Sequence, residues 1–211
     1  MNVKNFVNEL TTLDFDNTFN PYVDRCEVHD YRGAPGKRKA LLGNILKAAS
    51  KVEIDSIWVG RDLGHRGGRR TGLALTDDVH LPVHAQRWGI NVPKITKGQV
   101  MPERTASVIW QVLNEIPKPI FLWNVFPLHP FEAGKPFTNR SHNAKERAAG
   151  EEMLALLINI LKPKQLVAIG NDAQNSVDRM AGAIECTKVR HPSYGGQSIF
   201  LKQIKTLYEL G

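Results

Sequence analysis

Four short segments that are typical of β-strands constrain the fold more than any other feature of this sequence, and the first three are mainly apolar. They span residues 56–60, 119–126, 165–170 and 184–189. Each has the length of a buried strand, and the segments between them carry apolar residues at helical spacing. Strands that alternate with helices predict an α/β layered fold with a mostly parallel sheet.

Helices are predicted between and after these strands. The clearest covers residues 143–161, where the apolar residues at helical spacing are Met153, Leu154, Leu157, Ile158 and Leu161. The other expected helices are 37–51, 102–116, 173–182 and 197–210. We expect residues 1–35 to be irregular, and 61–100 and 127–141 to be connecting loops. Trp58 and Trp110 are expected to lie in the core. The whole chain, 1–211, is expected to form one domain.

Two titratable residues follow predicted strands closely. Asp62 comes after the strand that ends at Gly60, and His191 comes after the strand that ends at Val189. The carboxyl ends of parallel strands meet at one edge of a sheet, and ligands bind at that edge. Asp62 and His191 are therefore predicted to face one pocket, an arrangement that general acid–base or electrostatic catalysis requires.

The composition indicates the cellular compartment in which this protein is expected. Apolar residues make up 42% and charged residues 23%, as in ordinary globular proteins. No apolar run approaches the roughly 20 residues of a membrane span, and the first residues lack the apolar stretch of a signal peptide. We therefore expect a cytoplasmic protein with no membrane partner. Its two cysteines, Cys26 and Cys186, are expected to be reduced thiols.

Basic residues gather in the predicted loop that follows the first strand. The chain has a formal net charge of +7, and this loop contributes Arg61, Arg66, Arg69 and Arg70 between glycines. Lys and Arg bind phosphates by releasing counterions, so a nucleic-acid partner is favoured. A solvated basic loop without a ligand is the alternative.

Metal and nucleotide cofactors are not expected. His80 and His84 have the i, i+4 spacing of zinc ligands on a helix, but Pro82 lies between them and no third ligand is evident. Gly60 and Gly64 do not form the glycine pattern of a dinucleotide site. Two cysteines cannot supply the four ligands of a usual iron–sulfur cluster.

Four motifs together resemble the uracil-DNA glycosylase superfamily, and the resemblance covers most of the chain. Residues 60–65 (Gly-Arg-Asp-Leu-Gly-His) are similar to the water-activating loop Gly-Gln-Asp-Pro-Tyr-His of one branch. Residues 70–77 (Arg-Thr-Gly-Leu-Ala-Leu-Thr-Asp) are similar to Arg-Thr-Gly-x-x-Phe-Thr-Gly of the thermophile-type branches. Residues 122–125 (Leu-Trp-Asn-Val) resemble the strand end that carries the base-binding Asn, and 191–193 (His-Pro-Ser) resemble the second active-site motif.

The resemblance implies a three-layer α/β/α sandwich around a four-stranded, mostly parallel sheet. It implies that Asp62 positions a water or stabilises a sugar cation, and that His191 hydrogen-bonds the carbonyl of the departing base. Asn124 would bind the base edge. Ser193 would touch phosphate, with Tyr194 and Gly195 in a loop that wedges into the duplex. The implied reaction is hydrolysis of the N-glycosidic bond of a flipped-out base in DNA, without a cofactor, by a protein expected to be a monomer.

Departures from the family pattern concern the base pocket. Gly64 stands where the similar branch has a Tyr that closes the space near the pyrimidine 5-position, so this space is expected to be open unless Leu63, His65 or another loop fills it. Leu75 replaces a Phe that stacks on the base. The substrate is therefore expected to be uracil or a 5-modified pyrimidine, in base-excision repair or in defence against modified foreign DNA.

Two other functions remain open at this stage. One is a non-catalytic nucleic-acid-binding protein that keeps the fold and the basic loop. The other is an enzyme that acts on free nucleosides or nucleotides. A binding protein should keep its function after Asp62 and His191 are replaced, whereas an enzyme should lose turnover.

Overall fold

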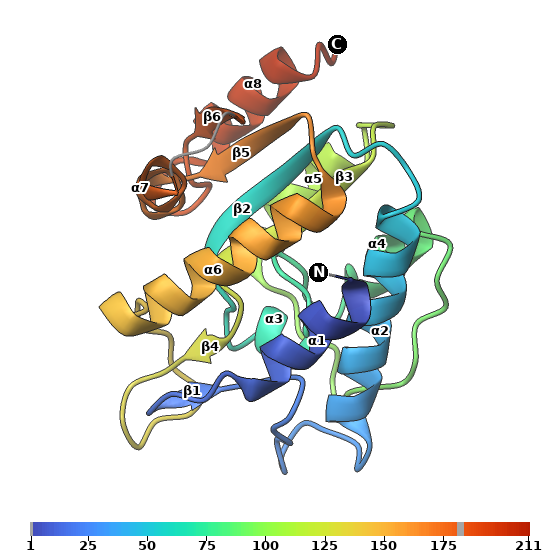
Figure 1. The fold of residues 1–211 in the computed structure, drawn as a ribbon, viewed down its shortest axis with the longest axis vertical. Helices are drawn as coiled ribbons and strands as arrows, with labels where there is room; N and C mark the ends of the chain where they lie inside the picture. Colours follow the sequence, from blue (N-terminus) through green and yellow to red (C-terminus); the bar gives the residue numbers. More distant parts are fainter. Residues whose placement is uncertain (1, 181–183) are drawn as a thin grey trace.

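A computed structural model describes residues 2–180 and 184–211. Its central sheet has four parallel strands in the order β3-β2-β5-β6 (Figure 1). The strands are β2 (Ser56–Asp62), β3 (Ile120–Phe126), β5 (Gln165–Ile169) and β6 (Glu185–Val189). The four predicted strands are confirmed, with boundaries that shift by one or two residues.

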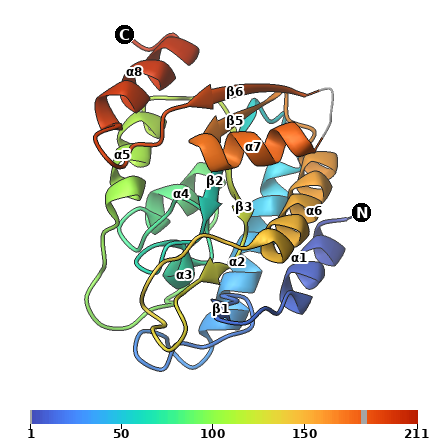
Figure 2. The same ribbon diagram turned by 90° about the vertical axis from the view of Figure 1, so that its left-hand side faces the viewer.

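Helices cover both faces of this sheet, which gives three layers (Figure 2). The helices α1 (Val3–Thr12), α2 (Ala34–Ala49), α6 (Ala144–Leu161) and α7 (Asn171–Arg179) pack on one face, and α5 (Arg104–Leu113) and α8 (Gln197–Leu207) on the other. Side chains alternate between the faces, so Ile57 joins the first core cluster and Trp58 the second. The predicted α/β/α sandwich is confirmed.

The helix α6 shows how local sequence sets an element boundary. The Asn143 side chain accepts hydrogen bonds from the backbone N–H groups of Lys145 and Glu146, and the Glu146 carboxylate accepts one from the Asn143 backbone N–H. This capping box satisfies donors that a helix start leaves free. The helix α7 begins two residues before the predicted 173, and the last two residues of that prediction, 181–182, lie outside the described residues.

The prediction that residues 1–35 are irregular is wrong. They contain α1, capped by the Asn2 side chain, which accepts a hydrogen bond from the Asn5 backbone N–H. Apolar residues recur at i, i+3, i+4 and i+7 in this segment, at Val3, Phe6, Val7 and Leu10. The helix signal was therefore present in the sequence, and α1 buries it against α2 and α6.

The two predicted loops also contain regular structure. Residues 61–100 include the short helices α3 (Gly68–Thr71) and α4 (Leu81–Arg87). Residues 127–141 include β4 (His129–Pro130), which pairs with β1 (Thr18–Phe19) in an antiparallel ribbon. These elements are too short to carry a periodic signal, and tertiary packing stabilises them.

Three further expectations are tested by burial and helix composition. Trp58 and Trp110 are fully buried, which confirms that both belong to the core. The thiols of Cys26 and Cys186 are free. Among the helices of the described residues, none is both long and apolar enough to cross a membrane.

Candidate active site

A cleft of about 480 Å³ lies at the carboxyl edge of the parallel sheet. Residues at and just beyond the ends of β2, β5 and β6 line it, among them Asp62, Gly170 and His191. Its volume is in the range of small-molecule sites. The prediction that Asp62 and His191 face one pocket is confirmed, because the parallel strands β2 and β6 end at the same edge.

Both carboxylate oxygens of Asp62 have partners. Oδ2 accepts a hydrogen bond from Arg61 Nε at 2.7 Å, and Oδ1 lies 2.5 Å from His142 Nδ1. The Asp62 side chain is only 6% exposed. Arg61 also donates to Asp172 at 3.2 Å, which holds its guanidinium in place. These contacts fix the direction in which the carboxylate points.

His142 is a site residue that none of the sequence motifs contains. It lies just before Asn143, the capping residue of α6, and its side chain is 8% exposed. The helix cap therefore fixes the backbone that carries the imidazole. The preceding Arg140 is anchored as well, because its guanidinium donates to both oxygens of Glu146.

His191 is held as a neutral imidazole. The backbone N–H of Ser193 donates to His191 Nδ1 at 3.1 Å, so this nitrogen accepts and Nε2 carries the proton of the neutral ring. Burial lowers the pKa of His191 below its usual value, and the nearby Arg61 and Arg190 lower it further. A neutral imidazole with a free Nε2–H can donate a hydrogen bond into the cleft.

Gly170 makes the close packing behind His191 possible. It directly follows β5 with φ +91°, a conformation that favours glycine, and a Cβ there would lie 3.1 Å from the His191 Cβ. The carboxyl end of β5 thus supports the imidazole from below.

Asn124 lies under the cleft with an unsatisfied side chain. It is 1% exposed, and neither its Oδ1 nor its Nδ2 has a hydrogen-bond partner among the described residues. A Cβ at Gly60, its register partner on β2, would overlap Asn124 Oδ1 and come within 2.9 Å of Leu75 Cδ2. Leu75 lines the cleft and Asn124 does not, so the amide is covered in this structure.

The space beside Gly64 is filled, and Glu103 fills it. A Cβ built on Gly64 would lie 2.9 Å from Glu103 Oε1. Neither Leu63 nor His65 is responsible, because the carboxylate comes from the residue that precedes α5. Burial raises the pKa of Glu103 to about 7, and the neighbouring Asp77 adds to this rise. Of the alternatives that the sequence left open at Gly64, the structure shows the one in which another segment fills the space.

The predicted basic loop is mostly buried. Arg66 is exposed, whereas Arg69 and Arg70 are 5% and 3% exposed. The Arg69 guanidinium stacks 3.8 Å from the centre of the Phe19 ring, and Arg70 pairs with Asp78 at 2.6 Å. Neither guanidinium is free to contact a DNA phosphate in this structure, which corrects the expectation for these two residues.

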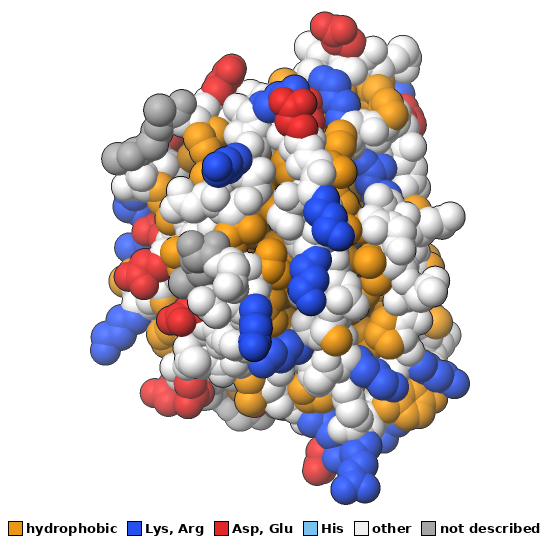
Figure 3. Space-filling model, turned by 45° about the vertical axis from the view of Figure 1, so that its right-hand side comes forward, with side chains coloured by type: hydrophobic (Ala, Val, Ile, Leu, Met, Phe, Trp, Pro, Cys, Tyr) orange, Lys and Arg blue, Asp and Glu red, His pale blue; other side chains and the backbone are white. Residues whose placement is uncertain are grey.

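Basic side chains also lie on the surface away from the cleft. Figure 3 shows Lys and Arg side chains spread along the displayed face from one end of the molecule to the other. The net charge of +7 is thus not confined to a single patch on this face.

The loop after β6 projects from the rim of the cleft. Tyr194 is 96% exposed and adopts φ +52°, and Gly195 follows with φ +75°. Two successive left-handed residues form the tip of this loop. Ser193 Oγ lies 3.5 Å from Thr105 Oγ1, between the tip and α5.

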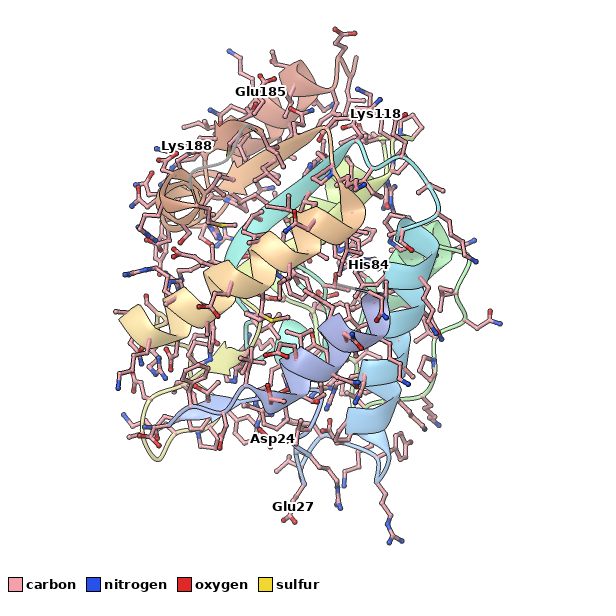
Figure 4. The ribbon with its side chains drawn as sticks, viewed as in Figure 1. Asp24, Glu27, His84, Lys118, Glu185 and Lys188 are labelled. Atoms are coloured by element: carbon pink, nitrogen blue, oxygen red, sulfur yellow. The ribbon has the colours of Figure 1, made fainter. Side chains whose placement is uncertain are left out.

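His80 and His84 each contact a polar side chain of the protein. His84 Nδ1 lies 2.8 Å from Thr76 Oγ1, and burial lowers the His84 pKa to about 3. His84 belongs to α4 and is 3% exposed, and Figure 4 labels it in the interior of the molecule. His80 Nδ1 lies 2.6 Å from Asp77 Oδ1. Over residues 2–180 and 184–211, no three His, Cys, Asp or Glu side chains are grouped as metal ligands.

Fold and cleft define the class of this protein, an α/β/α sandwich with a carboxylate and a neutral imidazole at the carboxyl edge of its sheet. The family model of the uracil DNA glycosylase superfamily matches residues 46–206. The chain belongs to this superfamily.

A solved structure agrees with the fold over nearly the whole chain. The crystal structure of wild-type SMUG2 from Pedobacter heparinus is similar with a TM-score of 0.63 and 13% sequence identity. The match covers 99% of this chain and 97% of that one. No sequence among the curated proteins is similar enough to count as a relative.

Proposed function

We propose that this protein is a DNA glycosylase that hydrolyses the N-glycosidic bond of a flipped-out uracil or 5-modified pyrimidine. The product would be an abasic site in DNA. One observation carries the proposal: in a chain of this superfamily, the Asp62 carboxylate and the His191 imidazole line the same cleft. The same chemistry suits base-excision repair and defence against modified foreign DNA.

The two side chains match the charges that develop in this reaction. As the bond between C1′ and the base breaks, its electron pair leaves with the base and positive charge builds on the sugar. Asp62 would stabilise that positive charge or orient the water whose oxygen bonds to C1′. The Nε2–H of His191 would donate to the carbonyl oxygen of the leaving base. Such fixed groups lower a barrier because they need no reorganisation.

Asn124 is suited to bind the base edge. An amide offers a donor and an acceptor together, which a uracil or cytosine edge can satisfy. Its buried, unpartnered state supports this role, since buried polar groups are costly without a partner. Leu75 would move from above Gly60 when the base enters. Leu75 and Gly64 would then border the bound base.

DNA contacts would come from the exposed elements around the cleft. Arg66 and Ser193 would approach phosphates, and Tyr194, which is 96% exposed, would enter a duplex together with Gly195. Filling the space of an extruded base offsets the few kcal/mol that flipping costs. We propose that a monomer binds double- or single-stranded DNA in this way.

The proposal is tested with labelled oligonucleotides that carry uracil or a 5-substituted pyrimidine. Alkali cuts the strand wherever a base has been removed. The wild-type protein should produce cuts at one or more of these bases. Asp62→Asn and His191→Ala should each lower the rate by orders of magnitude while DNA binding persists, and Glu9→Gln on α1, outside the cleft, serves as the control.

The alternative of a non-catalytic DNA-binding protein has one observation in its favour. Both oxygens of Asp62 are already engaged, by Arg61 and His142. On this alternative, DNA binding of the Asp62→Asn and His191→Ala double variant equals that of the wild type, and neither protein removes a base.

A further inference from the structure

Glu103 lies in the wall of the cleft, and a hydrogen bond to its backbone holds it there. It is the residue before the first turn of α5, and its backbone N–H donates to Asp77 Oδ2 at 2.6 Å. This bond holds the backbone while the side chain extends toward the loop after β2. Glu103 lines the same cleft as Asp62 and His191.

Two glycines make room for the Glu103 carboxylate. A Cβ on Gly64 would lie 2.9 Å from Oε1, and a Cβ on Gly67 would overlap Oε2. Any other residue at these positions would displace the carboxylate. The glycine-rich loop therefore leaves room for the Glu103 carboxylate, which adds an acidic group to this side of the cleft.

The Glu103 carboxylate has no protein donor. None of the described residues donates a hydrogen bond to either of its oxygens, and the residue is half-buried. An acceptor that points into a ligand cleft without a protein partner is suited to a donor on the ligand.

One edge of a bound pyrimidine ring would face the side of the cleft formed by Gly64 and Glu103. Its N1 carries the sugar, its O2 side would face His191, and its N3 and C4 edge would face Asn124. The 5-position is the substituent-bearing position that remains. A side chain on the Gly64 side of the cleft would therefore meet whatever is attached there.

Resting on the proposed function, we propose that Glu103 determines substrate specificity by accepting a hydrogen bond from a hydroxyl-bearing substituent at the 5-position of the base. A 5-hydroxymethyl group supplies that donor. A 5-methyl group would be pressed against a carboxylate without compensation, and hydrogen has no donor to offer. A site built for a ligand hydroxyl rejects the analogue that lacks it more strongly than an apolar pocket does.

The test compares 5-hydroxymethyluracil with thymine, which differ by one hydroxyl, and includes uracil as the unsubstituted reference. The measured quantity is the ratio of kcat/KM values for matched duplexes. Wild-type protein should favour the hydroxymethyl base. Glu103→Leu should lower this preference on the order of 10- to 100-fold, the range for a hydrogen bond to a charged group. Glu103→Gln should lower it less, because its amide oxygen can still accept a hydrogen bond.

A second measurement separates this inference from the proposed function. In an Asp62→Asn background, the affinity for oligonucleotides with each base is measured with and without Glu103→Leu, and thermal unfolding checks that each variant folds. A hydroxyl preference that disappears with Glu103 supports the inference even where no base is excised. A preference that is absent, or that survives both Glu103 substitutions, overturns it.

Discussion

His142 is predicted to position the Asp62 carboxylate. In His142→Ala, Oδ1 loses its 2.5 Å partner while Arg61 still holds Oδ2. The carboxylate is 6% exposed, so water cannot freely replace the lost contact. A hydrogen bond to a charged group is worth about 1.5–3 kcal/mol, which predicts a loss in kcat on the order of 10- to 150-fold. KM should change little, because His142 does not line the cleft.

The assay measures single-turnover excision and DNA affinity separately. It uses whichever oligonucleotide the wild type cleaves fastest. His29→Ala, a half-buried histidine outside the cleft, is the control. Asp62→Ala should cost more than His142→Ala, since it removes the charge itself. The reasoning is refuted by a His142→Ala rate equal to that of the wild type, or by a loss that appears only in DNA affinity.

Three further predictions concern charge, packing and pH. Arg66→Ala should weaken DNA binding and reduce the slope of log affinity against log salt by about one, which salt titrations measure. Arg70→Ala should cost about 3 kcal/mol of unfolding free energy, which denaturant melts measure, because the buried Asp78 carboxylate loses its charged partner and keeps only neutral donors. Gly60→Ala should abolish base excision in a protein that still binds DNA, since its Cβ would overlap the Asn124 amide. The folded-state pKa of Glu103, about 7, lies above the usual 4.5, so the folded protein holds this proton more tightly and loses stability as pH rises from 4.5 through 7. The Tm of Glu103→Gln should thus fall less than that of the wild type between pH 5 and 8.

The sheet was predictable because three of its four strands are short, mainly apolar runs. Ile57 and Trp58 both had to be buried, and a strand with helices on both faces buries neighbours on opposite sides. Helix α1 was missed although Val3, Phe6 and Val7 show its spacing. The turn signals that follow it in the first 35 residues outweighed a pattern of only ten residues.

The site was predictable where residues follow strands directly. Asp62 and His191 meet because strand ends meet, and this follows from topology alone. Contacts made by other segments could not be inferred in the same way. Glu103 reaches Gly64 because the start of α5 folds back on the loop after β2, and His142 reaches Asp62 through the cap of α6.

The burial of Arg69 and Arg70 likewise could not be inferred from the sequence. Arginines between glycines are typical of an exposed phosphate-binding loop. Here Phe19 and Asp78, from β1 and the segment before α4, supply the partners that make burial favourable. Composition cannot reveal these partners, because the three segments come together only in the folded chain.

The most direct test of the proposed reaction follows its two products. The protein is incubated with DNA that carries uracil or 5-hydroxymethyluracil, and the free base and the DNA strand are measured by mass spectrometry. The account predicts release of the intact free base and an uncut strand with an abasic sugar, both lost in Asp62→Asn. DNA that keeps every base across this substrate set, or a strand that borohydride traps covalently on the protein, would contradict it.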